Sequence, residues 1–182
     1  MSRTPMLAAT LAVAAVATLS TAANAARIER EVGMLGNATT NCQGALPAFE
    51  GAIRKRPLAV QNEGTTNAFV TCSFTTEYDD ESPTLRVASY FGAYFINSST
   101  TAKQVTCSGV AGYQTGASNT YVSKTITVAA NGTAQAQLFF TPADNAGNGY
   151  HPLVSISCNL LPGVGINDTY VGYVTVDDIG AN

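Results

Sequence analysis

Few residues in this sequence could carry out covalent or acid–base chemistry. His151 is the only histidine among the 182 residues, so a Ser-His-Asp or Cys-His arrangement would have to use it. His151 comes directly before Pro152 at the start of an apolar segment, and the sequence contains no Gly-x-Ser-x-Gly nucleophile motif. We interpret His151 as a turn residue and predict no catalytic residue of the nucleophilic type.

Carboxylates offer two further kinds of site. The densest acidic group surrounds Asp79, Asp80 and Glu81, just before Pro83, where we expect a loop. These three residues are candidate ligands for calcium, because hard oxygen ligands converge readily from loops, although their spacing does not match an EF-hand. The alternatives are a solvated acidic loop and a hydrolase that uses a pair of carboxylates. No other cofactor is predicted.

Aromatic side chains gather in residues 89–95, which read Ser-Tyr-Phe-Gly-Ala-Tyr-Phe. Successive side chains of an extended chain point to opposite faces, so Phe91 and Phe95 share one face while Tyr90 and Tyr94 share the other. The first face suits a core. Tyr90 and Tyr94, on either side of Gly92, would form a shallow aromatic platform for a sugar ring or a partner. The alternative is a central strand that is covered on both faces.

One basic run, Arg54-Lys55-Arg56, is also a candidate binding element. It could meet an anionic surface such as outer-membrane lipid or an acidic polysaccharide. The alternative is a solvated loop that carries no ligand.

The four cysteines, Cys42, Cys72, Cys107 and Cys158, indicate two disulfides if the chain is exported. Zinc is disfavoured because no Cys-x-x-Cys motif occurs and the single histidine is far from any cysteine in the sequence. Three pairings are possible. We predict Cys42–Cys72 and Cys107–Cys158, since this pairing closes the shorter loops, and each bridge would stabilise the fold by about 3–4.5 kcal/mol.

The first 25 residues have the features of a secretory signal peptide. Arg3 precedes an Ala-, Leu- and Val-rich segment over residues 6–19, and Ala23-Asn24-Ala25 is a small-x-small cleavage motif. The apolar segment is shorter than the roughly 20 residues that span a bilayer. We predict cleavage after Ala25 and a single domain over residues 26–182. The Ala-rich composition is typical of bacterial signals, so the expected destination is the periplasm, the cell surface or the medium.

Composition excludes several classes of protein. Without residues 1–25, 157 residues remain, with a formal net charge of −4 and with 41 Thr, Asn or Ser residues. The charge is too small and the acids are too many for a nucleic-acid binder. The apolar content is too high for a disordered chain, and no second apolar segment is long enough to cross a membrane.

The elements that must position these residues are short strands. Apolar and polar residues alternate in runs that are separated by Gly, Asn, Pro and Thr clusters. Cys72, Cys107 and Cys158 all fall on the apolar face of such a run. The predicted strands cover residues 58–62, 68–74, 87–96, 104–108, 121–129, 135–140, 154–160 and 170–176. About eight short strands predict an all-β fold, an antiparallel β-sandwich of the immunoglobulin-like or jelly-roll-like kind.

Two local signals refine this prediction. Asn131-Gly132 predicts a hairpin turn between two strands, because both residues tolerate positive φ. Residues 27–35 carry a short helical pattern, and an ordered arm or an edge strand is the alternative.

Together these features predict a secreted, non-catalytic β-sandwich that serves as a structural or interaction module of the bacterial envelope or the extracellular space. A protein partner or self-association would then be expected. The alternatives are a carbohydrate-binding module that uses the aromatic platform and, less favoured, a carboxylate-dependent hydrolase. Neither nucleic acid nor a transmembrane segment after signal cleavage is expected.

Overall fold

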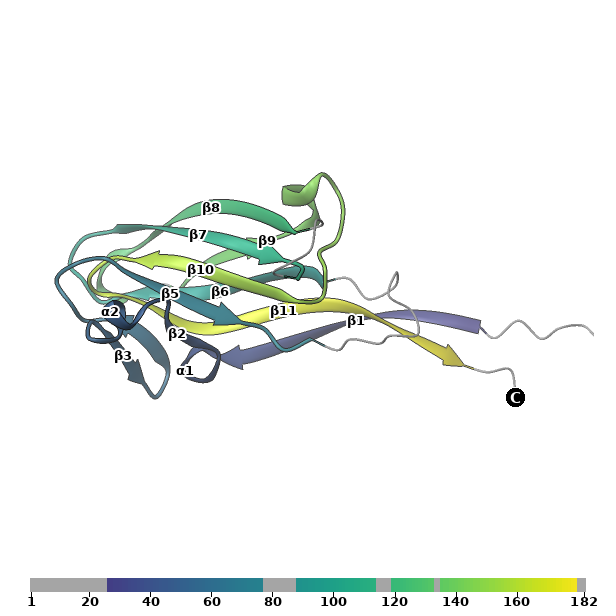
Figure 1. The fold of residues 1–182 in the computed structure, drawn as a ribbon, viewed down its shortest axis with the longest axis horizontal. Coiled ribbons are helices and arrows are strands. Elements are labelled where there is room, and N and C mark those ends of the chain that lie inside the picture. Colours follow the sequence, from purple (N-terminus) through teal and green to yellow (C-terminus); the bar gives the residue numbers. More distant parts are fainter. Residues whose placement is uncertain (1–25, 77–87, 114–118, 133–134, 180–182) are drawn as a thin grey trace, which may run out of the picture.

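The computed structural model confirms the all-β prediction and shows two antiparallel sheets packed face to face (Figure 1). It describes residues 26–76, 88–113, 119–132 and 135–179. The candidate calcium ligands Asp79, Asp80 and Glu81, and the predicted signal peptide, lie outside these residues. No helix in the described part of the chain is long and apolar enough to cross a membrane.

The first sheet has six strands. Its order is β3-β4-β11-β6-β9, and β1 pairs with β11 as well. Its strands are β1 (Ala26–Asn37), β3 (Ile53–Arg56), β4 (Ala59–Asn62), β6 (Ala88–Asn97), β9 (Ala136–Phe140) and β11 (Val164–Ile179). The prediction of about eight strands therefore undercounts, because the eleven described strands include very short ones that show no alternation in sequence.

The second sheet has five strands in the order β2-β5-β10-β7-β8. Its strands are β2 (Cys42–Gly44), β5 (Ala68–Ser73), β7 (Lys103–Ala111), β8 (Thr120–Val128) and β10 (Val154–Leu160). Four short helical segments connect strands: α1 (Ala38–Asn41), α2 (Pro47–Glu50), η1 (Ala130–Gly132) and η2 (Pro142–Asn145).

The core lies between the inward faces of the two sheets. In β10 the even-numbered residues from Val154 to Leu160 are buried, as their alternation with Ser and Asn predicts. From the six-stranded sheet, Phe91 stacks on Phe140 with ring centroids 5.2 Å apart. Tyr150 packs edge-on against Phe91 at 4.9 Å. The five-stranded sheet thus contributes aliphatic side chains and cysteines to the core, and the six-stranded sheet contributes aromatic as well as aliphatic side chains.

Both predicted disulfides are confirmed, and both lie within the five-stranded sheet. Cys42 and Cys72 face each other across β2 and β5, and Cys107 and Cys158 face each other across β7 and β10. All four cysteines are buried. Each bridge therefore joins two neighbouring strands that already pair through their backbones, and it fixes their register.

A buried asparagine ends β4 where the chain crosses from the six-stranded to the five-stranded sheet. The side chain of Asn62 is fully buried, and its Nδ2 donates to the carbonyl oxygens of Thr66 and Leu160, each at 2.8 Å. Its Oδ1 accepts from the backbone N–H of Gly64 at 2.9 Å. One side chain thus pairs with three backbone groups, two in the crossing turn and one at the end of β10.

A second buried asparagine, Asn97, ends β6 in the same way, where the chain crosses to β7. Asn97 is fully buried, and its Nδ2 donates to the carbonyl oxygens of Thr101 and Val128. Its Oδ1 accepts from the backbone N–H of Ser99 at 2.9 Å. Residues 62–65 and 97–101 are rich in Asn, Ser, Thr or Gly, a composition that predicts turns, and the structure shows that the first asparagine organises each.

Two local predictions are wrong. Residues 27–35 belong to strand β1, so the helical alternative fails and the edge-strand alternative holds. The pairing of twelve successive residues with β11 outweighs a short helical pattern that Gly33 and Gly36 interrupt. Asn131 and Gly132 do have positive φ, at 62° and 60°, but they do not close a hairpin. β8 pairs with β7 in one sheet and β9 pairs with β6 in the other, so this turn connects the sheets.

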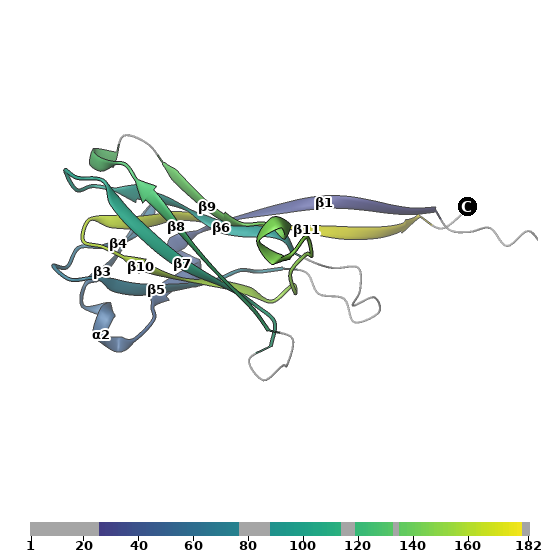
Figure 2. The same cartoon turned by 90° about the horizontal axis from the view of Figure 1, so that it is seen from above.

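The first and last strands form a ribbon that projects from the sandwich. β6 pairs with β11 only as far as Tyr173, whereas β1 continues to pair with β11 as far as Ile179. Figure 1 and Figure 2 both show β1 and the end of β11 running side by side beyond the other strands. The outer edge of β1 has no paired strand among the described residues.

Candidate functional site

Four aromatic side chains meet on the outward face of the six-stranded sheet. Tyr90 and Tyr94 come from β6, Phe139 from β9 and Tyr170 from β11, and all four are partly exposed. We call them the aromatic cluster. Ring centroids of Phe139 lie 6.1 Å from Tyr90, 5.4 Å from Tyr94 and 6.2 Å from Tyr170. Each of these contacts is edge-to-face, the geometry that aromatic quadrupoles favour.

Glycines beneath the rings let the cluster lie close to the sheet. Gly92 is the cross-strand partner of Phe139, and a Cβ there would lie 2.7 Å from Phe139 Cδ1. Gly172 pairs with Tyr90, and a Cβ there would lie 2.5 Å from Tyr90 Cε1. Larger residues at these two positions would push the rings outward. Phe139 fills the space above Gly92, so a third ring lies between Tyr90 and Tyr94. Whether these rings bind a ligand stays a prediction.

Two tyrosine hydroxyls meet inside the cluster. The rings of Tyr90 and Tyr170 stack at 5.5 Å with an angle of 11° between their planes. Tyr90 Oη donates to Tyr170 Oη at 3.4 Å. This hydrogen bond, together with burial, raises the pKa of Tyr90 to about 12. The Tyr90 phenol is therefore protonated at neutral pH, and its hydroxyl lies beside apolar ring surface.

Polar side chains border the cluster on both sides of Tyr94. Asp168 of β11 and Gln137 of β9 are its cross-strand partners. Directly opposed residues on one face have Cβ atoms about 4.5–5.5 Å apart, so the carboxylate and the amide flank the Tyr94 ring. Aromatic surface bordered by hydrogen-bonding groups can bind a ring that is apolar on its faces and polar at its edges.

The basic run lies on edge strand β3, which β4 separates from β11, and β11 in turn separates it from the strand of Tyr90 and Tyr94. Its three side chains are exposed but engaged locally. Arg54 donates to the carbonyl oxygens of Gly51 and Ile53, Lys55 donates to that of Thr39, and Arg56 donates to Glu63 Oε1 at 2.7 Å. The structure therefore does not bring these cations together with Tyr90 and Tyr94.

His151 is held by local contacts. Its Nδ1 accepts from the backbone N–H of Leu153 at 3.0 Å, and its ring packs edge-on against Tyr113 at 4.6 Å. Burial lowers the pKa of His151, so the ring is neutral at physiological pH. Within the described ranges no three His, Cys, Asp or Glu residues gather as metal ligands do. The calcium prediction at Asp79, Asp80 and Glu81 stays a prediction.

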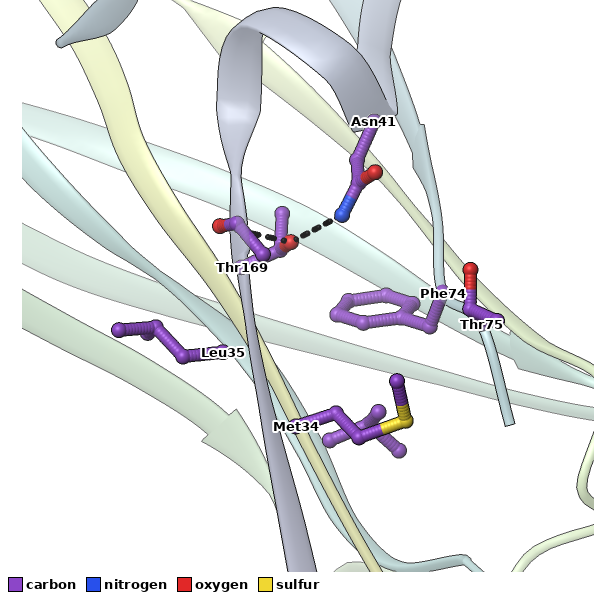
Figure 3. A pocket seen from close by; sticks show the side chains of 8 residues that line it. Met34, Leu35, Asn41, Phe74, Thr75 and Thr169 are labelled. Atoms are coloured by element: carbon purple, nitrogen blue, oxygen red, sulfur yellow. Dashed lines mark hydrogen bonds between the residues drawn. The ribbon is translucent and has the colours of Figure 1, made fainter. Parts of the chain in front are cut away.

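A separate hollow of about 190 Å³ opens where β1 leaves the sandwich (Figure 3). Asn41 Nδ2 donates to Thr169 Oγ1 at 2.8 Å, and Thr169 Oγ1 donates to the carbonyl oxygen of Gly36 at 3.3 Å. These polar groups thus satisfy one another, and none of the described residues that line the hollow is charged. Its remaining lining is Met34, Leu35, Phe74, Thr75 and Val171.

The sequence predicts two of the four rings, Tyr90 and Tyr94, as binding residues. Phe139 lies opposite to Leu138 and Phe140 in an alternating run, so its outward position follows from the same period that marks the core residues. The outward position of Tyr170 does not follow from alternation, because a register shift between Ile166 and Asp168 changes which residues of β11 face outward. Strand pairing, which the sequence does not reveal, then brings both beside Tyr90.

Comparisons with known proteins show no family. No protein-family model and no curated protein matches this sequence. Among solved structures, a family 11 carbohydrate-binding module from Clostridium thermocellum, in complex with a mixed-linked tetrasaccharide, is 10% identical with a TM-score of 0.38. The match covers 80% of this chain and 87% of that module.

Two further matches are equally distant. A family 16 carbohydrate-binding module is 13% identical over 70% of this chain and 81% of its own, with a TM-score of 0.33. An exo-β-1,3-galactanase from Phanerochaete chrysosporium is 13% identical with a TM-score of 0.37, and the match covers 81% of this chain and 29% of that enzyme. At such low TM-scores we infer nothing about a ligand from these likenesses.

Proposed function

We propose that this chain is an exported, non-catalytic binding module whose ligand is a glycan, and that the ligand docks on the aromatic cluster. The observation that carries the proposal is the convergence of four partly exposed rings from three strands on one outward face. A soluble protein normally buries such rings or uses them for binding.

The chemistry of the cluster suits a sugar ring. The C–H face of a pyranose is apolar and packs on aromatic surface, while its hydroxyls need hydrogen-bond partners at the border. The cluster supplies the surface with Tyr94 and Phe139. Gln137 and Asp168, on either side of Tyr94, supply the polar groups. The site lies on a sheet face rather than in a cleft, which favours an extended chain lying across it.

The covalent structure supports an exported destination. Two disulfides in a chain of this length suit an oxidising compartment, as the predicted signal peptide requires. The protein would then bind its glycan at a bacterial cell surface, in the periplasm or in the medium.

A glycan array tests the proposal, with two tyrosine variants as matched probes. Tyr94→Ala removes a ring from the cluster, whereas Tyr121→Ala removes a ring that is 69% exposed on β8 of the other sheet. We expect wild type and Tyr121→Ala to bind the same glycans and Tyr94→Ala to bind them about ten-fold more weakly, or worse. An array without hits, or equal binding by all three proteins, would remove the proposal.

Protein–protein interaction is a second candidate function, favoured by the outer edge of β1, which pairs with no strand in the part of the chain that the structure describes. Leu35, on this strand and opposite Tyr170, is 67% exposed and extends the apolar surface to the sheet edge. A strand of a partner or of a second copy could add to such an edge. Sedimentation equilibrium over a wide concentration range tests self-association, and Leu35→Lys should then weaken it. A monomer at every concentration would count against pairing between copies.

A further inference from the structure

The described outward side chains around the aromatic cluster include acidic groups and no basic ones. Among the outward positions of β1, β11, β6 and β9 with described side chains, two are acidic, Glu31 and Asp168, and none is Lys or Arg. A surface patch of this size normally mixes both signs. Lys124 does reach the carbonyl oxygen of Phe139, but its charge is paired with Asp144. The described outward side chains of these four strands therefore carry an excess of negative charge.

Asp168 is the acid closest to the rings by register. It is the cross-strand partner of Tyr94 and precedes Tyr170 by two residues on the same face of β11. Neither described ion pair, Arg56 with Glu63 or Lys124 with Asp144, involves it, and no described residue donates a hydrogen bond to its carboxylate. A carboxylate that faces outward beside two rings, without an internal partner, is available to a ligand.

Glu31 borders the other end of the cluster. Ser89 Oγ donates to Glu31 Oε1 at 3.0 Å, which holds the carboxylate next to β6. Its charge is one of the smaller causes of the raised pKa of Tyr90, after the hydrogen bond to Tyr170 and burial. The two carboxylates thus lie on opposite sides of the ring group, one near Tyr94 and one near Tyr90.

We propose that the glycan bound by the aromatic cluster carries positively charged amino groups, as a deacetylated amino-sugar polymer does. This inference rests on the proposed glycan-binding function and specifies its ligand. An ammonium group is attracted both to the electron-rich face of an aromatic ring and to a carboxylate beside it. An acidic polysaccharide would meet repulsion from Asp168 and Glu31. The basic run cannot compensate for this, because its cations lie on β3 and donate to local groups.

Oligomers that differ only in N-acetylation test the inference. Isothermal titration would compare glucosamine oligomers with N-acetylglucosamine oligomers of equal length, for wild type, Asp168→Asn and Glu50→Gln. The control, Glu50→Gln, makes the same change of charge on α2 and keeps the oxygen that accepts from the backbone N–H of Gly44.

We expect wild type and Glu50→Gln to prefer the glucosamine oligomer by about five-fold, the ratio that an exposed ion pair or a cation–π contact provides. Asp168→Asn should lose most of this preference. Added salt should weaken binding of the glucosamine oligomer more than binding of the acetylated one, because screening affects only the charged ligand.

The possible failures are distinct. Equal affinity for both oligomers, or a preference that Asp168→Asn leaves intact, would overturn the amine inference while leaving glycan binding in place. If neither oligomer binds but wild type binds a neutral or acidic glycan on the array, the amine inference is again overturned. If no glycan binds at all, the proposed function fails as well.

Discussion

The pKa of the Tyr90 hydroxyl reports whether the aromatic cluster is formed. Its pKa is about 12 because its proton is held in a hydrogen bond to Tyr170 and because the ring is partly buried. The unfolded chain has a tyrosine pKa of about 10. A raised pKa in the folded state stabilises the fold fully below pH 10, and this contribution is lost as the pH rises from about 10 to about 12.

Tyr170→Phe should lower the pKa of Tyr90 toward 10, since the acceptor of its hydrogen bond is gone while burial remains. The chain has eight tyrosines, so the titration of Tyr90 is obtained as the difference in phenolate absorbance between proteins with and without Tyr90→Phe. The difference curve should move to lower pH in the Tyr170→Phe background. An unchanged midpoint would show that the hydroxyl pair does not form in solution.

Gly92 should tolerate no side chain. A Cβ at this position would meet Phe139 and the carbonyl oxygen of Leu138, so β9 or the ring would have to shift. We expect Gly92→Ala to destabilise the fold by about 1–3 kcal/mol, the usual cost of overpacking. Gly51→Ala is the control, because a Cβ at Gly51 would meet nothing within 4 Å. Gly147 also has open space around it, but its positive φ would strain an alanine. Equal unfolding midpoints for Gly92→Ala and Gly51→Ala would contradict the packing described.

The alternation of apolar and polar residues predicts some of the outward-facing site residues and misses others. The outward placement of Tyr90 and Tyr94 follows from period two alone, because the inward face of the same strand is so clearly apolar. Tyr170 and Asp168 do not follow, since a bulge near Ile166 shifts their face. Bulges and strand partners depend on contacts between distant segments, and a single sequence does not record them.

At the scale of elements, two crossings between the sheets depend on one buried asparagine each. Asn62 and Asn97 hold equivalent bonds, to a backbone N–H two residues ahead and to a carbonyl oxygen four residues ahead. Each also bonds a carbonyl oxygen of the five-stranded sheet. The sequence predicts both turns from composition, but the buried position of the first asparagine is visible only in the structure.

Asn62→Ala should destabilise the protein by about 3 kcal/mol, because it leaves buried backbone groups without partners. Asn97→Ala should cost a similar amount for the same reason. Asn148→Ala, at an exposed position, is the control and should cost less than about 0.5 kcal/mol. Urea unfolding measures all three. If the buried and exposed substitutions cost the same, the asparagine side chains do not organise the crossings.

The two disulfides also join strands of the five-stranded sheet, β2 to β5 and β7 to β10. The Cys107–Cys158 bridge closes a sequence separation of 51 residues, and loop closure predicts that it stabilises the fold by about 4 kcal/mol. We expect the double substitution of both cysteines by Ala to lower the free energy of unfolding by about 2–4 kcal/mol. Because β7 and β10 remain paired through their backbones, the far-ultraviolet circular dichroism should stay that of a β protein. Complete loss of the β signal at low temperature would show that the bridge is required to form the sheet.

Across the whole molecule, four clustered rings lie on the outward face of the six-stranded sheet, whereas among the described rings Phe69 on β5 of the other sheet packs only against Phe49. The outward positions of β7 and β8 carry mainly Ser and Thr, with Tyr121 as an isolated exposed ring. The aromatic cluster and its two carboxylates all lie on the other sheet. A ligand that recognises aromatic surface should therefore bind one side of the sandwich, away from the disulfide-bonded sheet.

The most direct test of this account is chemical-shift mapping by nuclear magnetic resonance with the best glycan from the array. The account predicts that backbone amide shifts concentrate on β6, β9 and β11 around Tyr90, Tyr94, Phe139 and Tyr170. Amides of β8 near Tyr121 should stay unchanged at saturation. Shifts that concentrate on β7 and β8, or along the outer edge of β1 without the aromatic cluster, would contradict the assignment of this face as the glycan-binding site.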